Sequence, residues 1–373
     1  MPFSPDYVTA RKRFREAAAR LGWTLQSYPV ESSGPQGEDL TIDVAISPSP
    51  QAERVLVVSS GLHGVEGFLG SAVQIALLER GQHASRVPAG VRYVLVHALN
   101  PFGFAWSRRF DAENIDPNRN FLLEGEAYGG DSKTYERFDT LLNPKTPPSR
   151  WDLFHARALW QIARHGRAAL KQALATGQYD FPQGLFFGGR RPSRTHAIVR
   201  QALKSWIGGA RTVAHLDFHT GLGAWGTCKL LVDHPLSDMQ KERLTRWFGA
   251  DAWEQNDPRK VAYNARGSLG QWCVAQEYAP DYVFAFAEFG TYNDVAVIAG
   301  LRAENQAHHW GRPEDPGTKR AKARLRELFC PASPAWRSQV LAKGIDLVDR
   351  AVSGLLSEGA TAVSELPAAM LRA

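Results

Sequence analysis

Residues 61–67, Gly-Leu-His-Gly-Val-Glu-Gly, place two metal-binding groups in one short segment. His63 and Glu66 offer a ring nitrogen and a carboxylate oxygen, which are donors that zinc takes from proteins. The glycines leave the backbone free to turn both side chains toward one point. A catalytic zinc site has three protein ligands and keeps a position for water, so this pair is a partial site. A polar turn facing solvent could contain the same residues. A third ligand elsewhere in the chain would favour the zinc site over this alternative.

Two further candidates each follow an apolar run. His219 comes directly after residues 211–218, and Glu288 comes directly after residues 282–287. His219 would complete the ligand set, and Glu288 would be the general base that takes a proton from the water and hands it to the leaving group. Both have alternatives, since His219 could be a buried histidine satisfied by backbone and Glu288 a structural ion-pair partner. Three other histidines are rival ligands: His97, His215 and His234.

The elements that must position these residues form an α/β pattern. Residues 55–59 and 91–99 are apolar runs that predict buried strands, and residues 68–80 between them have the composition of a helix. Strand, loop, helix and strand make a βαβ unit, so at least part of the sheet is parallel. Residues just past the carboxyl ends of neighbouring parallel strands meet in one crevice. We therefore predict a single mixed, largely parallel sheet flanked by helices on both faces.

The rest of the 373-residue chain extends this pattern within a single domain, 1–373. Further strands are predicted at 23–30, 40–47, 211–218, 229–232 and 282–287. Helical spacing predicts helices at 5–22, 151–176, 193–206, 237–248, 268–278, 293–310, 318–328 and 335–356. We expect a helical insertion around residues 122–210, which could cover the crevice and restrict it to small molecules. A C-terminal helical extension is expected from about residue 316.

Composition and charge exclude several classes of protein. Hydrophobic residues make up 44% and charged residues 22% of the chain, as in ordinary globular proteins and unlike disordered or fibrous ones. The net charge of +6 is spread along the sequence without a basic run, so we expect no nucleic-acid partner. Three widely spaced cysteines fit reduced thiols. With neither a signal segment nor a membrane-spanning run in the sequence, we expect a cytoplasmic protein with no membrane partner.

Four short motifs occur in an order that resembles a known family. They are His63-Gly-Val-Glu66, Asn118-Arg119-Asn120-Phe121, Asp217-Phe-His219-Thr220-Gly221 and Ala287-Glu288-Phe289-Gly290. The pattern is similar to the zinc carboxypeptidase superfamily, the carboxypeptidase A-like fold, and most like a bacterial branch known as a domain of unknown function. The resemblance covers residues 55–292. It implies one Zn²⁺ per chain, held by His63, Glu66 and His219, with Glu288 as the base.

The resemblance also implies residues that bind the substrate. Asn118 and Arg119 would grip its terminal carboxylate, because a planar guanidinium binds a carboxylate through two parallel hydrogen bonds. A second arginine would polarise the scissile carbonyl and stabilise the oxyanion, and Arg109 is favoured over Arg108 for this role. Tyr263 would close over the substrate and donate its hydroxyl, or it would be a core tyrosine.

The function implied is that of a metallocarboxypeptidase-like zinc hydrolase, which cleaves an amide bond next to a free carboxylate in a small peptide. The main alternative keeps the zinc and changes the substrate to an N-acyl amino acid, as in the aspartoacylase and succinylglutamate desuccinylase branch. A third hypothesis is a binding protein that keeps the fold without turnover. The presence of Glu288 beside a complete ligand set argues against this third hypothesis.

Overall fold

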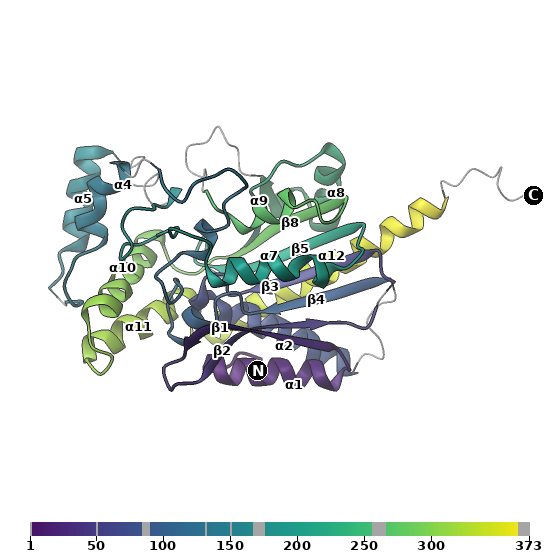
Figure 1. Cartoon of the computed structure of the whole chain (residues 1–373), viewed down its shortest axis with the longest axis horizontal. Helices are drawn as coiled ribbons and strands as arrows, with labels where there is room; N and C mark the ends of the chain where they lie inside the picture. Colours follow the sequence, from purple (N-terminus) through teal and green to yellow (C-terminus); the bar gives the residue numbers. More distant parts are fainter. Residues whose placement is uncertain are drawn as a thin grey trace, which may run out of the picture.

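The computed structural model describes residues 2–49, 51–83, 90–130, 133–149, 151–166, 176–255 and 266–364. An eight-stranded sheet runs through the described part of the chain (Figure 1). Its strands are β1 (Thr24–Ser33), β2 (Asp39–Ile46), β3 (Arg54–Ser60), β4 (Val91–His97), β5 (Thr212–Thr220), β6 (Cys228–Val232), β7 (Trp253–Gln255) and β8 (Asp281–Phe289). They lie side by side in the order β1-β2-β4-β3-β5-β8-β6-β7.

The middle of the sheet is parallel and its margins are mixed. Strands β4, β3, β5 and β8 run parallel to one another, whereas β2 pairs with β4 and β6 pairs with β8 in antiparallel fashion. The neighbouring pairs β3/β5 and β5/β8 bring together segments that are far apart in sequence. The predicted single mixed, largely parallel sheet is confirmed.

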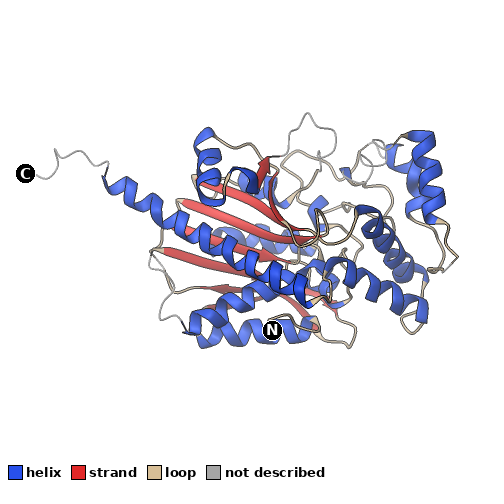
Figure 2. Ribbon diagram, turned by 180° about the vertical axis from the view of Figure 1, so that it is seen from behind, coloured by secondary structure: helices blue, strands red, loops and turns tan. Residues whose placement is uncertain are grey.

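Helices cover both faces of this sheet. One face carries α1 (Tyr7–Arg20), α2 (Gly67–His83), α8 (Asp238–Phe248) and α12 (Pro334–Ser364), whose apolar side chains form one cluster with alternate strand residues such as Leu56. The other face carries α7 (Arg194–Ile207) and α9 (Leu269–Ala275), which pack on residues such as Val57. Figure 2 shows α12 crossing the strands on its face. The alternation of Leu56 and Val57 between two cores explains why residues 55–58 of β3 are all apolar.

A second group of helices lies at one end of the molecule (Figure 1). It comprises α4 (Lys133–Leu142), α5 (Phe154–His165), α10 (Asp294–Trp310) and α11 (Pro316–Phe329). Phe138 of α4, Leu301 of α10 and Leu325 of α11 share a core with Val65, which lies in the predicted metal-binding segment. This group therefore supports that segment from outside the sheet. Whether residues 122–210 are an insertion, and the chain from about 316 an extension, stays a prediction.

Helices α7 and α8 each begin at a serine that caps the first turn. The Ser193 side chain accepts a hydrogen bond from the His196 N–H at the start of α7, and Ser237 forms a capping box with Gln240 at the start of α8. The predicted helix at 268–278 is too long, because the chain leaves the helix at Gln276 and Glu277 has a φ of 50°. Sequence periodicity did not predict α4 or the three-residue strand β7.

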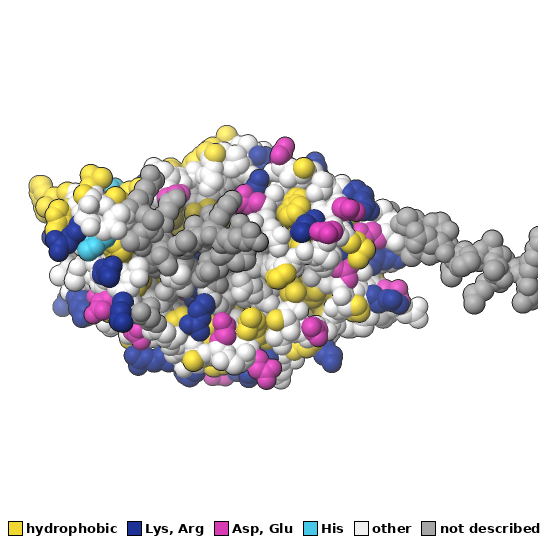
Figure 3. All heavy atoms as spheres, turned by 90° about the horizontal axis from the view of Figure 1, so that it is seen from above, with side chains coloured by type: hydrophobic (Ala, Val, Ile, Leu, Met, Phe, Trp, Pro, Cys, Tyr) yellow, Lys and Arg dark blue, Asp and Glu magenta, His cyan; other side chains and the backbone are white. Residues whose placement is uncertain are grey.

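The surface of the described residues carries both charges, interspersed on the face shown in Figure 3. Apolar side chains also gather there at the end occupied by α5, where Leu159 and Trp160 are exposed. Among the described residues, no helix has the length and apolar character needed to cross a membrane.

Candidate metal centre

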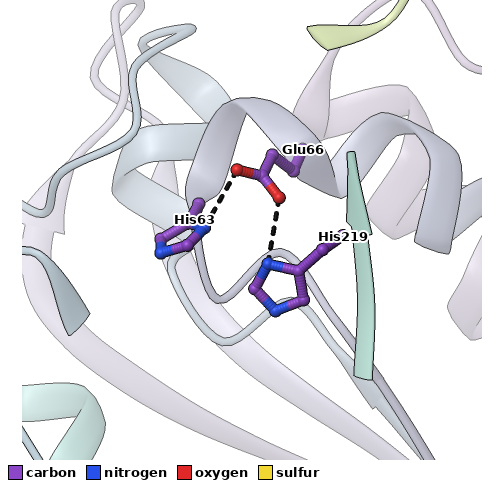
Figure 4. Close-up of side chains that lie close together, drawn as sticks. All are labelled: His63, Glu66 and His219. Atoms are coloured by element: carbon purple, nitrogen blue, oxygen red, sulfur yellow. Dashed lines mark hydrogen bonds and ion pairs between the residues drawn. The ribbon is translucent and has the colours of Figure 1, made fainter. Parts of the chain in front are cut away.

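His63, Glu66 and His219 converge on one buried point, as Figure 4 shows. Each offers a ligand atom, and these atoms all lie within 4.8 Å of one another. His63 Nδ1 lies 2.9 Å from Glu66 Oε1, and His219 Nδ1 lies 3.0 Å from Glu66 Oε2. The relative exposures of 4%, 2% and 3% show that the three side chains belong to the interior. The structure thus brings together the three residues predicted as ligands.

The segment that carries His63 and Glu66 is held by close backbone packing. After β3 ends at Ser60, the chain enters the short helix η1 (Gly64–Glu66). A Cβ at Gly64 would lie 2.1 Å from the backbone carbon of Gly103, so only glycine fits there. The N–H groups of Gly64 and Val65 donate to the carbonyls of Arg109 and Arg108. These contacts tie the site segment to the chain around residue 109.

Each histidine of the cluster also faces a second carboxylate. His63 Nε2 lies 3.2 Å from Asp116 Oδ1, and His219 Nε2 lies 2.5 Å from Asp217 Oδ2. Metal-ligating histidines commonly donate their other ring N–H to such a carboxylate, which would fix the ring and the tautomer of His219. His63 Nε2 also faces the Arg109 guanidinium, which only donates, so the contact with Asp116 does not by itself fix the His63 tautomer. With both Nδ1 atoms and the Glu66 carboxylate directed at one point, the donor set fits zinc.

Asp116 is a residue of the site that the sequence motifs did not predict. It stands two positions before Asn118, in an Asp-Pro-Asn-Arg segment. Its Oδ1 also accepts a hydrogen bond from the Asn118 N–H. The position of this acidic residue, close to a candidate substrate-binding motif, was the feature of the sequence that could have predicted its place in the site.

Charge within the cluster shifts the pKa of several groups. Burial by itself would raise the pKa of Glu66, but the charges of His63 and His219 and their hydrogen bonds hold it well below the usual range. For Asp116, the Arg109 guanidinium and His63 likewise outweigh burial and lower the pKa. Burial would lower the pKa of His219, but Asp217 and Glu66 raise it well above the usual value. The centre therefore holds ionised carboxylates in the interior, an environment that favours a bound cation.

Glu288 lies beside the cluster on the neighbouring strand. It is the register partner of His219 in the parallel pair β5/β8, and its side chain is mostly buried. Glu288 Oε1 accepts a hydrogen bond of 2.9 Å from the Leu222 N–H. Burial and the charge of Glu66 raise the pKa of Glu288 to about 7, against the opposing influence of His219 and this N–H. A carboxyl group with a pKa near neutrality is suited to taking up and releasing a proton.

The two consecutive arginines have different surroundings. Arg109 lies at the cluster, with Nη2 2.6 Å from His63 Nε2 and Nε donating to Asp116 Oδ2 at 2.9 Å. Arg108 is completely buried, with Nε 3.4 Å from Glu304 Oε1 and Nη2 donating to Asn114 at 2.8 Å. Arg108 therefore uses its guanidinium within the protein interior, and this placement argues against the alternative that it faces the substrate.

The predicted carboxylate-binding pair adjoins the same region. Arg119 is 8% exposed and donates through Nη1 to the Asn118 carbonyl, while its Nε has no hydrogen-bond partner among the described residues. Burial lowers the pKa of Arg119, and Asp116 opposes that change. The Asn118 side-chain oxygen accepts from the Leu269 N–H at the start of α9. Tyr263 lies outside the described residues.

The rival histidines are held elsewhere. His97 Nε2 lies 2.9 Å from Ser71 Oγ, and its ring stacks on Phe14. His234 lies against the Phe284 backbone of β8. His215 has its ring nitrogens next to side-chain hydroxyls of neighbouring strands. Among the described residues, His63, Glu66 and His219 are the one group of three or more His, Cys, Asp or Glu side chains that could hold a metal ion.

Comparisons with known proteins agree with this architecture. A family model described as "Protein of unknown function (DUF2817)" matches residues 3–343. No protein in the curated set matches the chain.

Solved structures of carboxypeptidases are among those similar to the chain. Carboxypeptidase A from Helicoverpa armigera has 14% sequence identity and a TM-score of 0.50, over 86% of this chain and 73% of that one. The structure of bovine thrombin-activatable fibrinolysis inhibitor in complex with tick carboxypeptidase inhibitor matches at 10% identity and a TM-score of 0.47, over 95% and 97%. The metallo-carboxypeptidase from Burkholderia cenocepacia has 12% sequence identity and a TM-score of 0.43, over 89% of this chain and 68% of that one. The first of these likenesses shows the carboxypeptidase A-like fold, and it confirms the resemblance seen in the sequence.

Proposed function

Because the chain belongs to the family described as protein of unknown function (DUF2817) and has a carboxypeptidase A-like fold, we propose that it is a zinc-dependent hydrolase. The bond cleaved would be an amide next to a free carboxylate. The observation that carries the proposal is the convergence of His63, Glu66 and His219, with Glu288 on the adjacent strand. Two imidazoles and one carboxylate are a ligand set that catalytic zinc sites use.

The three cluster residues would hold the metal through the atoms that face one another. These are Nδ1 of His63, Nδ1 of His219 and the carboxylate of Glu66. Asp116 and Asp217 would keep both rings oriented from the opposite side. When bound, zinc would supply Lewis acidity, which polarises a carbonyl group and makes water more acidic.

Glu288 would move the proton that amide hydrolysis requires. It would accept a proton from the attacking water and deliver it to the departing nitrogen. The Leu222 N–H orients its carboxylate, and the raised pKa of about 7 allows both transfers near neutral pH. Arg109, which is directed at the cluster, would stabilise the negative charge that develops on the carbonyl oxygen.

The substrate's free carboxylate would be bound by Arg119 and Asn118. The buried Arg119 Nε without a partner among the described residues supports this role, because a buried charged donor needs an acceptor. A small peptide and an N-acyl amino acid both present such a carboxylate. The two substrate classes differ in the group on the other side of the amide, so a substrate panel distinguishes them.

Metal analysis followed by a hydrolysis screen tests the proposal. We expect one zinc per wild-type chain, a large loss of zinc in His63→Ala, and normal zinc in the control His155→Ala, because His155 is exposed on α5. The screen compares dipeptides and N-acyl amino acids with the same compounds carrying a C-terminal carboxamide. Hydrolysis should require the free carboxylate. Full zinc in His63→Ala, or equal hydrolysis of the carboxamides, would contradict the proposal, and zinc without any turnover would indicate a binding protein.

A further inference from the structure

A line of buried polar side chains extends from the metal centre into the middle of the sheet. His215, Asp217 and His219 alternate along β5, so their side chains point to one face of the strand. Ser59 of β3 is the register partner of Asp217, and Tyr282 lies on β8 at the other side of β5. The three central strands thus contribute to one line of side chains: Tyr282, His215, Ser59, Asp217 and His219.

Each neighbouring pair in this line is within hydrogen-bond distance. Tyr282 Oη lies 2.9 Å from His215 Nδ1, and His215 Nε2 lies 2.7 Å from Ser59 Oγ. Ser59 Oγ donates to Asp217 Oδ1 at 2.6 Å, and Asp217 Oδ2 lies 2.5 Å from His219 Nε2. None of the five residues is more than 4% exposed. Solvent therefore does not compete for these hydrogen bonds.

The number of protons that each group can donate fixes the direction of every hydrogen bond in this line. A carboxylate only accepts, and a serine hydroxyl has a single proton, so Ser59 donates that proton to Asp217. Ser59 Oγ must then accept from His215 Nε2–H. A neutral imidazole protonated on Nε2 has a lone pair on Nδ1, which accepts from the Tyr282 hydroxyl. Burial supports the neutral form, since it lowers the pKa of His215 to about 4.

We propose that Tyr282, His215 and Ser59 are positioning residues, which act through Asp217 to hold a proton on His219 Nε2 and leave the Nδ1 lone pair for the metal. The proposal rests on the zinc site proposed above. The opposite tautomer would place the proton between His219 Nδ1 and Glu66 Oε2, which are 3.0 Å apart. That proton would occupy both donor atoms and compete with the cation. With Asp217 holding the proton on Nε2, the proton that a bound cation displaces from His219 is the one on Nδ1.

The direction of these hydrogen bonds can be measured without an enzyme assay, from the tautomer of His215. We expect ¹⁵N NMR of histidine-labelled, zinc-loaded protein to show His215 as a neutral ring with the proton on Nε2 at neutral pH. His215→Gln assigns the resonance. A proton on Nδ1 of His215 would overturn the proposal, because Ser59 would then have to donate to His215 and could not donate to Asp217.

Zinc affinity provides the second measurement. Ser59→Ala removes the link to Asp217, and we expect zinc to bind about tenfold more weakly in a chelator competition, at the lower end of the range for outer partners of metal ligands. Ser60→Ala is the matched control, since Ser60 is equally buried on the same strand and donates to Gln74 instead. The zinc affinity of Ser60→Ala should stay within about twofold of wild type, because Ser60 contacts neither a ligand nor Asp217.

Tyrosine variants separate positioning from a general loss of stability. Tyr282→Phe should weaken zinc binding less than Ser59→Ala, because the change lies one step further from Asp217. Tyr135→Phe is its control, a buried tyrosine in α4 whose hydroxyl donates to the Leu185 carbonyl. Equal zinc affinities for Ser59→Ala and Ser60→Ala would overturn this proposal alone. A wild-type protein that takes up no zinc would overturn the proposed function as well, so the two failures are distinguishable.

Discussion

His219 and Glu288 are register partners on the parallel strands β5 and β8, so the third predicted ligand and the predicted base emerge side by side at one point of the sheet. Neighbouring strands lie about 4.8 Å apart, which is close enough for the two side chains to act on one bound molecule. The backbone N–H of Leu222, just beyond β5, donates to Glu288 and holds its carboxylate near the cluster. This strand pairing is the structural basis for the first prediction.

Glu288→Gln should lose on the order of 10² to 10⁴ in kcat, the usual range for general acid–base catalysis, while zinc content and Tm stay near wild type. The amide keeps the shape of the side chain but cannot accept the proton. Zinc content, Tm and kcat should be measured on one preparation. A variant with near-normal kcat, or one that loses stability but keeps its turnover per folded molecule, would mean that Glu288 is a structural residue.

Arg109 and Arg108 should differ sharply although they are neighbours in sequence. Arg109→Ala should lower kcat per folded molecule by about 10² to 10³, as expected for loss of an oxyanion-stabilising group. It should also lower Tm, because it leaves the buried Asp116 without one of its partners. Arg108→Met should instead destabilise the fold by about 3 to 5 kcal/mol, because it leaves the buried Glu304 without one of its partners. Urea unfolding and steady-state kinetics of both variants test this contrast. Comparable losses of kcat per folded molecule would contradict the assignment.

Arg119→Lys should raise KM for carboxylate-bearing substrates about tenfold, because an ammonium cannot make the two parallel hydrogen bonds of a guanidinium. Zinc content should not change, since Arg119 is not one of the ligand residues. Arg191→Lys is the control, because Arg191 is exposed and pairs with Glu113 at the surface. If KM is the same for both variants across a carboxylate series, Arg119 does not bind the substrate.

His97 should make the protein less stable in mild acid. Burial lowers the pKa of His97 to about 4, whereas a histidine in the unfolded chain titrates near 6.5. The unfolded state therefore binds more protons below pH 6.5, and this contribution to stability is lost as the pH falls from about 6.5 to 4. At pH 5 the loss should be about 2 kcal/mol.

His97→Gln removes this titration and should reduce the stability difference between pH 7 and pH 5 by about the same 2 kcal/mol. Urea unfolding of wild type and variant at both pH values measures it. The exposed His155 supplies the control, since His155→Gln should leave the pH dependence unchanged. An unaltered pH dependence in His97→Gln would show that His97 does not titrate in this range.

The sequence by itself determined the local features on which the site depends. The spacing of His63 and Glu66 placed both on one short segment after a strand, and the apolar runs predicted β3, β5 and β8. Such features depend on residues close in sequence, because strand and helix periodicity is a local property. The mixed, largely parallel sheet followed from the same patterns.

Only the tertiary structure decided which distant groups meet. Four histidines were candidates for the third ligand, and the pairing of β5 with β3 brings His219 to Glu66. Asp116 reaches His63, and the burial of Arg108 against Glu304 leaves Arg109 to face the cluster. These outcomes depend on long-range strand pairing and on the packing of α10, and a residue's neighbours in sequence do not contain that information.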